Sequence, residues 1–293
     1  MDQLDLLESQ SIYILRQAYR SFKDLVMLWS MGKDSTVLLW LTRKAFFGHV
    51  PLPLLHIDAG FKIPQMIEFR DNLARKLRLN LIVGKNIQPI EAKQTFPDGA
   101  VSRLECCQLL KTEALKKTLS GEWPRWILDH TTGQYIRQDG GKPFTGVIVG
   151  ARVDEEASRS KERYFSCRDQ HGQWDIADQP PELWDQFNTD FPPGAHVRIH
   201  PLLDWTELQI WQYIDKEKIE VVDLYFDQGN GKRYRFLGCW PCTSPVNSTA
   251  RTAHQIADEL AHGQFTKVAE RSGRQQDKED AGSLETLRRG GYM

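Results

Sequence analysis

Residues 30–36 combine small, hydroxyl and charged side chains in a pattern that suits phosphate binding. An apolar run precedes them, and a run with helical spacing follows. If the first run is a strand and the second a helix, the turn points backbone N–H groups and the positive helix end at an anion. The side chains add hydroxyl donors and a positive charge: Ser30, Ser35, Thr36 and Lys33. The stretch predicts a phosphate-binding loop, with an ordinary strand-to-helix turn as the alternative.

Two positions distinguish this loop from the Walker loop. The Walker loop has a glycine five positions before its Gly-Lys pair and a serine or threonine directly after the lysine. Met27 and Asp34 stand at those positions here. We therefore expect the loop to grip phosphates without presenting the γ-phosphorus for transfer. Asp34 is then free to help hold a magnesium ion.

The pattern Ser-x-Gly-Lys-Asp-Ser, from Ser30 to Ser35, resembles the pyrophosphate loop of N-type ATP pyrophosphatases and 3′-phosphoadenylylsulfate reductases. This resemblance implies that ATP, with Mg²⁺, is cleaved between its α and β phosphates. It also implies an adenine nucleotide alpha hydrolase-like, Rossmann-like fold. Within the loop it assigns Met31 and Gly32 to nucleotide binding beside the polar residues.

Apolar patterns predict the elements that position the loop. Further strands are expected at 54–58, 79–83, 147–150 and 197–200, and helices at 4–20, after Pro64, at 108–119 and after Thr206. Strands alternating with helices favour an α/β fold with a mostly parallel sheet and helices on both faces. We expect residues 1–215 to form this domain, 121–143 a peripheral hairpin within it, and 216–293 a C-terminal elaboration.

Two strand ends are expected to lie beside the loop, because open α/β sheets bind ligands at the carboxyl ends of their strands. Asp58 ends the strand at 54–58, where it would assist metal or ribose binding or only cap a turn. Gly150 ends the strand at 147–150 and leads into a charged segment, residues 151–163. Its nucleotide-binding candidates are Arg152, Asp154, Arg159, Lys161 and Arg163. A solvated ion-pair surface is the alternative for this segment.

The charged segment resembles the Gly-Ala-Arg-x-Asp-Glu-Glu signature of the small, ATP-binding subunit of bacterial ATP sulfurylase. Similar matches at 237–241 and 280–285 extend the resemblance over nearly the whole chain. The resemblance implies that the loop residues Ser30, Gly32, Ser35 and Thr36 hold the leaving pyrophosphate. It assigns catalytic roles to Lys33, Arg159 and Arg163, which would balance the charge of the leaving pyrophosphate, and to Asp34, which would assist in binding the metal ion.

Four of the five cysteines form two pairs, Cys106-Cys107 and Cys239-x-x-Cys242. They could be unrelated buried thiols, or an all-thiolate zinc site, although adjacent cysteines suit a tetrahedron poorly. Their arrangement resembles the 4Fe-4S pattern of adenylylsulfate reductases, which implies that the four thiolates ligate one cluster. Those reductases use a further cysteine near the C-terminus, and none follows Cys242 here. Reduction of the substrate is therefore disfavoured.

Charge and hydropathy limit the partners and the cellular location that the sequence allows. The formal net charge of −1 gives no broad attraction to nucleic acid, so any DNA contact is expected to arrive through partners. No stretch approaches the length of an apolar membrane span, and the N-terminus lacks the basic and apolar regions of a signal peptide. We expect a cytoplasmic protein without membrane contact.

A sulfurylase-like body with a four-cysteine set resembles the Ssp-type ATP pyrophosphatases of DNA phosphorothioation. That resemblance predicts an ATP pyrophosphatase that adenylates a DNA backbone phosphate for sulfur insertion. Its partners would be a cysteine desulfurase and other phosphorothioation proteins, with DNA held by the assembly. The first alternative is a sulfate adenylyltransferase small subunit that works with a sulfurylase GTPase subunit. The second is a non-catalytic, nucleotide-sensing scaffold subunit.

Overall fold

The computed structural model describes residues 2–155, 159, 162–169, 196–265 and 270, together with single residues between 173 and 191. An eight-stranded sheet forms its centre, in the order β5-β4-β3-β2-β1-β6-β8-β7. Its strands are β1 Leu25–Leu28, β2 Leu54–Ile57, β3 Leu81–Gly84, β4 Arg125–Leu128, β5 Tyr135–Gln138, β6 Gly146–Ile148, β7 Phe165–Arg168 and β8 His196–Ile199. A separate antiparallel pair joins β9 Lys232–Arg233 to β10 Val246–Asn247.

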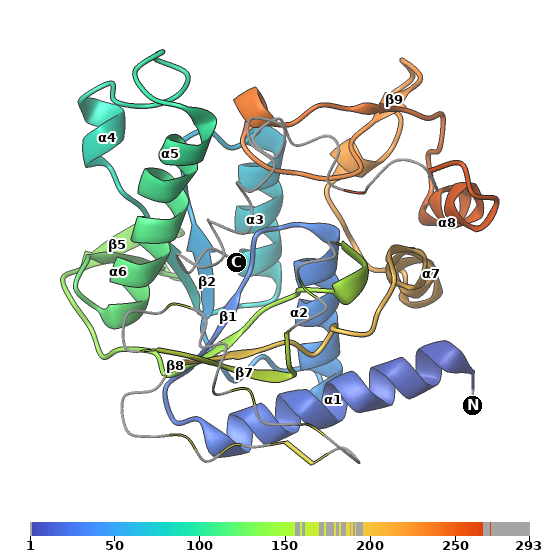
Figure 1. Ribbon diagram of the computed structural model, residues 1–293, viewed down its shortest axis with the longest axis horizontal. Coiled ribbons are helices and arrows are strands. Elements are labelled where there is room, and N and C mark those ends of the chain that lie inside the picture. The colour runs from blue at the N-terminus through green and yellow to red at the C-terminus, as the bar shows by residue number, and fades with distance from the viewer. Residues whose placement is uncertain are drawn as a thin grey trace.

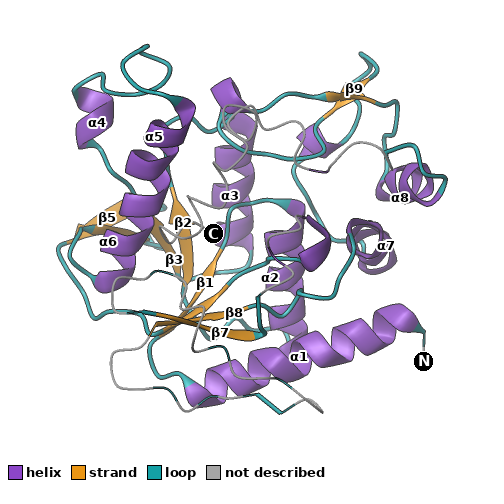
Figure 2. Cartoon of the chain, viewed as in Figure 1, coloured by secondary structure: helices purple, strands orange, loops and turns teal. Residues whose placement is uncertain are grey.

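The helices surround this sheet (Figures 1 and 2). The α-helices are α1 Gln3–Ser21, α2 Lys33–Ala45, α3 Pro64–Lys76, α4 Gln88–Glu91, α5 Arg103–Cys107, α6 Ala114–Ser120, α7 Glu207–Glu217 and α8 Ala253–Ala261. A π-helical turn, η1 Gln108–Glu113, joins α5 to α6. The 3₁₀ turns are η2 Val153–Glu155, η4 Asp223–Tyr225 and η5 Trp240–Cys242.

Five neighbouring strands, β3, β2, β1, β6 and β8, run parallel, and antiparallel strands lie at the two edges. The predicted fold class, a mostly parallel α/β sheet, is confirmed. Residues 121–143 contain a hairpin, but β4 and β5 continue the main sheet as its edge instead of standing apart from it. The edge strand β7 was not predicted from the sequence.

Side chains of β1 alternate between two apolar layers. Leu25 and Met27 belong to a large core cluster that includes residues of α1, α2, α3 and α7. Val26 and Leu28 belong to the opposite cluster with Leu115 of α6. Both faces of β1 are therefore buried, as the continuous apolar run from 25 to 28 requires for a central parallel strand.

The position of β1 creates a ligand-binding crevice. β1 pairs with β2 on one side and with β6 on the other. The strands that follow β1 are therefore added first on one side of it and later on the opposite side. Open α/β sheets bind ligands at such a reversal of strand order, outside the carboxyl ends of the strands. The loop between β1 and α2 lies at this point.

The helix predicted at 108–119 begins earlier than expected. Helical structure runs from Arg103 to Ser120, with the π-helical turn in its middle, so Cys106 and Cys107 lie within its first segment instead of before it. Ser102 caps its start by accepting the Glu105 N–H at 3.1 Å. π-Helical turns are rare and are common at functional sites. This one turns Lys111 toward the crevice, as described below.

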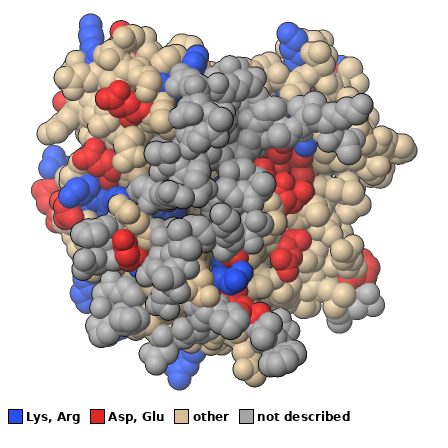
Figure 3. Space-filling view, in the orientation of Figure 1, with Lys and Arg blue, Asp and Glu red and all other residues tan. Residues whose placement is uncertain are grey.

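The surface shows no strong bias of charge. Acidic and basic side chains are interspersed on the face displayed in Figure 3, and neither sign forms a continuous field among the described residues there. No helix among the described residues is both long and apolar enough to cross a membrane.

Candidate active site

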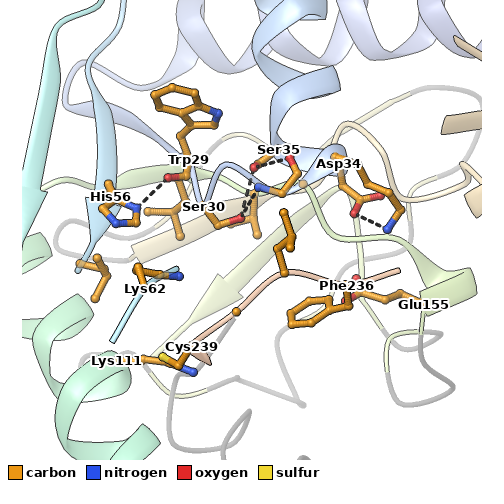
Figure 4. A pocket seen from close by; sticks show the side chains of 18 of the residues that line it. Trp29, Ser30, Asp34, Ser35, His56, Lys62, Lys111, Glu155, Phe236 and Cys239 are labelled. Carbon is orange, nitrogen blue, oxygen red and sulfur yellow. Dashed lines mark hydrogen bonds and ion pairs between the residues drawn. The ribbon is translucent and has the colours of Figure 1, made fainter. Parts of the chain in front are cut away.

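The loop after β1 has the geometry of an anion-binding turn. α2 begins at Lys33 with Gly32 at its N-cap, and Gly32, Lys33, Asp34 and Ser35 line the pocket beside it, so the positive end of the helix lies at this pocket. The hydroxyls of Ser30 and Ser35 lie 3.2 Å apart across the loop. Figure 4 shows both at the centre of the pocket, with Asp34 beside them. The loop therefore places two hydroxyl groups and the positive end of α2 at one cavity.

Backbone conformation and close packing shape this loop. Met31 has a φ of 61°, a left-handed conformation that is uncommon for a residue with a side chain, and its side chain is fully buried. Gly150 lies directly against the start of α2, where a Cβ would come within 3.2 Å of the Ser35 nitrogen. The buried side chain of Met31 therefore anchors the strand-to-helix turn in the core, and Gly150 packs closely against the start of α2.

The pocket is lined by polar groups at one end and apolar groups along its wall. Loop residues Ser30, Gly32, Lys33, Asp34 and Ser35 line it together with Gly150, Glu155 and Arg159. Leu28, Leu55, Ile57, Leu115 and Val149 form the apolar wall. Lys62 and Lys111 line it on the side where Figure 4 places Cys239, away from Asp34 and Glu155. Such a pocket suits a ligand with a flat apolar part and several negative charges.

A buried charge cluster lies beside the loop. The Arg152 Nε donates to Asp34 Oδ1 at 2.6 Å, its Nη1 to Asp154 Oδ2 at 3.0 Å, and its Nη2 to Glu270 Oε2 at 2.5 Å. Lys33 Nζ donates to Asp34 Oδ2 at 3.2 Å and to Glu270. We call these five residues the charge cluster. Lys33 and Arg152 are 1% and 0% exposed, so both depend on these carboxylates for compensation.

The charges in this cluster shift the pKa of its members. Burial alone would lower the pKa of Lys33, but Asp34 and Glu270 outweigh it and hold the pKa above its ordinary value. Burial would raise the pKa of Glu270, but Arg152 and Lys33 lower it to about 2. Both groups are therefore charged throughout the physiological range.

Most of the predicted nucleotide-binding residues come together. Seven line the pocket: Ser30, Gly32, Lys33, Asp34, Ser35, Gly150 and Arg159. Arg152 and Asp154 belong to the charge cluster behind the loop. Arg159 is held by Glu155, whose Oε2 accepts from Arg159 Nη1 at 2.5 Å. The alternative for segment 151–163, a solvated ion-pair surface, does not describe Arg152 and Arg159, since both are buried.

The remaining predicted residues lie elsewhere. Thr36 accepts a hydrogen bond from Trp29 Nε1 at 3.4 Å and does not line the pocket. Asp58 Oδ1 accepts the Gly60 N–H at 2.9 Å, which is a turn contact. Neither Met31 nor Arg163 lines the pocket. Lys161 lies outside the described residues.

Sequence reasoning missed several residues of the site, among them three that contact Lys33 or Arg159 directly. Tyr225 accepts the Lys33 N–H at 2.8 Å through its hydroxyl, and Glu270 pairs with Lys33; they are 192 and 237 residues away in the sequence. No local pattern reports contacts of that range. Glu155 stands four residues before Arg159, and this helical ion-pair spacing was a signal that could have identified it.

The four predicted cysteine ligands line a second cavity next to the first. Cys106, Cys107, Cys239 and Cys242 line it with Lys111, while Cys167 lies elsewhere. Burial raises the pKa of Cys106, and burial raises that of Cys242 to about 11. Lys111 Nζ donates to Cys107 Sγ at 3.4 Å, and Lys111 and Cys239 line both cavities. Among the described residues, no three His, Cys, Asp or Glu side chains lie close enough to hold a single metal ion.

Three comparisons identify relatives of this chain. Residues 24–245 match the phosphoadenosine phosphosulfate reductase domain family. Sulfate adenylyltransferase subunit 2 of Akkermansia muciniphila is 41% identical, covering 100% of this chain and 98% of the relative, and that of Yersinia pestis is 38% identical, covering 98% and 96%. The solved structure of Candida glabrata FMN adenylyltransferase with FMN and an ATP analogue superposes with a TM-score of 0.53 at 15% identity, covering 93% of this chain and 90% of that one, a likeness of fold.

These relatives correct one prediction and confirm another. The predicted role in DNA phosphorothioation is wrong, because the curated relatives that match the whole chain are sulfate adenylyltransferase subunits; they give no support to a cysteine desulfurase or DNA partner. The prediction that the chain is an enzyme of the adenylyltransferase class is confirmed. The chain belongs to the phosphoadenosine phosphosulfate reductase domain family and, within it, to the family of sulfate adenylyltransferase subunit 2.

Proposed function

We propose that this chain transfers the adenylyl group of ATP to sulfate and releases pyrophosphate, as the small subunit of a sulfate adenylyltransferase. The observation that carries the proposal is that Arg159 lines one pocket with the loop residues Ser30, Gly32, Lys33, Asp34 and Ser35, at the carboxyl ends of β1 and β6. The relatives that match nearly all of the chain support sulfate as the acceptor.

The chemistry needs positioning and charge balance more than a covalent intermediate. A sulfate oxygen attacks the α-phosphorus, the bond from that phosphorus to the α–β bridging oxygen breaks, and its electron pair leaves with pyrophosphate. Donors and cations aimed at the leaving group lower the barrier of such a displacement. Ser30, Ser35 and the start of α2 would hold the pyrophosphate, with Lys33 and Arg159 balancing its charge.

The rest of the pocket supports the same ligand. The apolar wall between Leu28 and Val149 suits the adenine base, which carries little charge. Asp34 is a carboxylate beside the phosphate end and would help hold the magnesium ion that arrives with ATP. This arrangement also argues against a non-catalytic scaffold, because Lys33, Asp34 and Ser35 all line the pocket in positions where they can act on a nucleotide.

A second subunit is part of this proposal. The relatives carry the name subunit 2, which supports a partner subunit. The resemblance to the small subunit of bacterial ATP sulfurylase implies that this partner is a GTPase. The test is release of pyrophosphate from ATP by the purified chain together with the proposed GTPase subunit, with and without sulfate. We expect release that requires sulfate. ADP and phosphate as products, or release unaffected by sulfate, would contradict the proposal.

We further propose that Cys106, Cys107, Cys239 and Cys242 ligate a 4Fe-4S cluster. A cluster binds each thiolate at a different iron atom, so its ligands must surround a cavity instead of meeting at one point, and the four cysteines border one cavity. Lys111 lines the same cavity, where its Nζ donates to Cys107 Sγ at 3.4 Å. A bound cluster would cross-link α5 to the η5 turn and can exchange an electron.

The metal content tests this second proposal. We expect iron and acid-labile sulfide in protein purified without oxygen, and loss of both in Cys242→Ser. Cys167→Ser is the matched control, because Cys167 is buried but lies outside the cysteine cavity, and it should keep the iron. Zinc without iron, or equal iron in the two variants, would contradict the cluster.

A further inference from the structure

The carboxylate of Glu270 lies in the charge cluster, between the two buried cations beside the phosphate loop. Its Oε1 accepts from Lys33 Nζ, and its Oε2 accepts from Arg152 Nη2 at 2.5 Å. The side chain is 4% exposed. Two oxygens that bridge two cations in this way present the same acceptors as two oxygens of a phosphate group.

With Glu270 in this position the cluster cannot accept another anion on Arg152. Asp34, Asp154 and Glu270 each take a different nitrogen of its guanidinium. The cluster holds two cations and three carboxylates, a formal charge of −1. Arg152 is fully buried and does not line the pocket, although it lies directly behind Asp34, which does. An incoming polyanion therefore meets two cations whose charges are already balanced by carboxylates.

Glu270 is the carboxylate of this cluster that can leave with least disturbance of the fold. Asp34 lies in the first turn of α2, and Asp154 in η2, where its Oδ2 also accepts the Glu207 N–H at 2.7 Å. Among the described residues, the carboxylate of Glu270 hydrogen-bonds only to Lys33 and Arg152. Removing it would leave two cations and two carboxylates, a neutral cluster open to a further anion.

We propose that Glu270 occupies the subsite of the leaving pyrophosphate and competes with it for Lys33 and Arg152. Pyrophosphate displaces the carboxylate when it binds, and Glu270 returns when pyrophosphate leaves, so the buried cations are never without a counter-charge. The inference rests on the proposed function, because it takes this end of the pocket as the leaving-group end.

The competition has a consequence for selectivity. An anion gains affinity only if it replaces both hydrogen bonds of Glu270 and adds contacts of its own. Pyrophosphate can contact the cluster with one phosphate group and Ser30 and Ser35 with the other. A single phosphate or sulfate can contact the cluster or the two serines, but not both. Glu270 therefore keeps the acceptor sulfate out of the leaving-group subsite.

The experiment is calorimetric titration of magnesium pyrophosphate into the full chain, with neither sulfate nor a partner subunit present. If Glu270 blocks the subsite in about nine molecules of ten, Glu270→Gln should bind pyrophosphate about tenfold more tightly than wild type. Glu270→Asp keeps the charge but shortens the reach, so it should bind with intermediate affinity. It also serves if the Gln variant does not fold, which thermal unfolding will show.

The matched control is Glu259→Gln. Glu259 Oε2 accepts from the buried Arg233 Nη2 at 3.0 Å, and the residue does not line the pocket, so its loss removes a comparable ion pair and should leave pyrophosphate affinity unchanged. Equal or weaker binding by both Glu270 variants, with wild-type binding intact, would overturn only the competition. Absence of pyrophosphate and ATP binding in every variant would overturn the proposed function and this inference together.

Discussion

Gly150 and Ser35 meet where β6 ends and α2 begins: a Cβ on Gly150 would lie 3.2 Å from the Ser35 nitrogen and 3.3 Å from the Asp34 carbonyl carbon. Both neighbours are backbone atoms of the first turn of α2, so they cannot move without moving the loop. The close approach of these two segments sets the width of the phosphate end of the pocket.

Gly150→Ala should therefore weaken nucleotide binding more than it weakens the fold. We expect the loop to shift by a few tenths of an ångström and the affinity for ATP to fall about tenfold, which corresponds to about 1.4 kcal/mol. The contrast is Gly146→Ala at the start of β6, where the Cβ would come within 2.7 Å of Leu25 Cδ1 and of Phe22 Cγ. That variant should lose about 1–3 kcal/mol of unfolding free energy through overpacking. ATP titration and urea unfolding measure the two, and wild-type ATP affinity in Gly150→Ala would contradict the prediction.

Arg159→Gln and Arg163→Gln should differ, although both arginines were predicted from the sequence to balance phosphate charge. Arg159 lines the pocket and Arg163 does not. We expect Arg159→Gln to raise KM for ATP by about tenfold or more, a loss of at least about 1.4 kcal/mol of binding. Arg163→Gln should change KM for ATP by less than about threefold, which corresponds to a much smaller loss of binding free energy. Equal effects of the two variants on KM would contradict the assignment of Arg159, and not Arg163, to the nucleotide pocket.

Tyr225→Phe tests the contact between the loop and the η4 turn. The phenol oxygen is the acceptor for the Lys33 N–H at 2.8 Å, and the ring is buried. Its loss should cost about 1 kcal/mol of unfolding free energy, the usual worth of one hydrogen bond. Tyr13→Phe is the control, because Tyr13 is half-exposed on α1 and should cost nothing measurable. Urea unfolding of the two variants checks the prediction, and equal stabilities would contradict it.

The sheet and the loop could be predicted because local sequence determines them. The continuous apolar run of β1 and the Gly-Lys-Asp-Ser that follows it are neighbours in the chain, so pattern and position agree. The charge cluster could not be predicted in full, since Glu270 and Tyr225 reach Lys33 from segments that only the folded chain brings near. Asp58 could not be decided from the sequence, because a carboxylate at a strand end suits both a ligand and a turn; in the structure it accepts the Gly60 N–H.

Acid should destabilise the protein through its buried histidines. Burial lowers the pKa of His200 to about 4 and that of His196 to about 3. Below an unfolded pKa near 6.5 the unfolded chain binds protons that the folded chain does not, so the unfolding free energy falls as pH drops from about 6.5 toward 4. His200 alone contributes up to about 3 kcal/mol across that window.

His200→Asn should flatten this pH dependence. Urea unfolding at several pH values between 7 and 4.5 measures it, and His49→Asn is the control because His49 is exposed. We expect the control to keep the wild-type slope and His200→Asn to lose part of it. The same slope in all three proteins would contradict the buried, neutral state of His200.

The most direct test of the central claim is the fate of labelled sulfate. The purified chain and a GTPase subunit of the proposed sulfate adenylyltransferase are incubated with magnesium ATP, GTP and ³⁵S-sulfate, and the products are separated. We predict that the label enters adenylylsulfate with one pyrophosphate released per labelled product, and that Lys33→Met, which removes the cation from the loop, abolishes both. ATP turnover that leaves all of the label in free sulfate, or that yields ADP in place of pyrophosphate, would contradict the account.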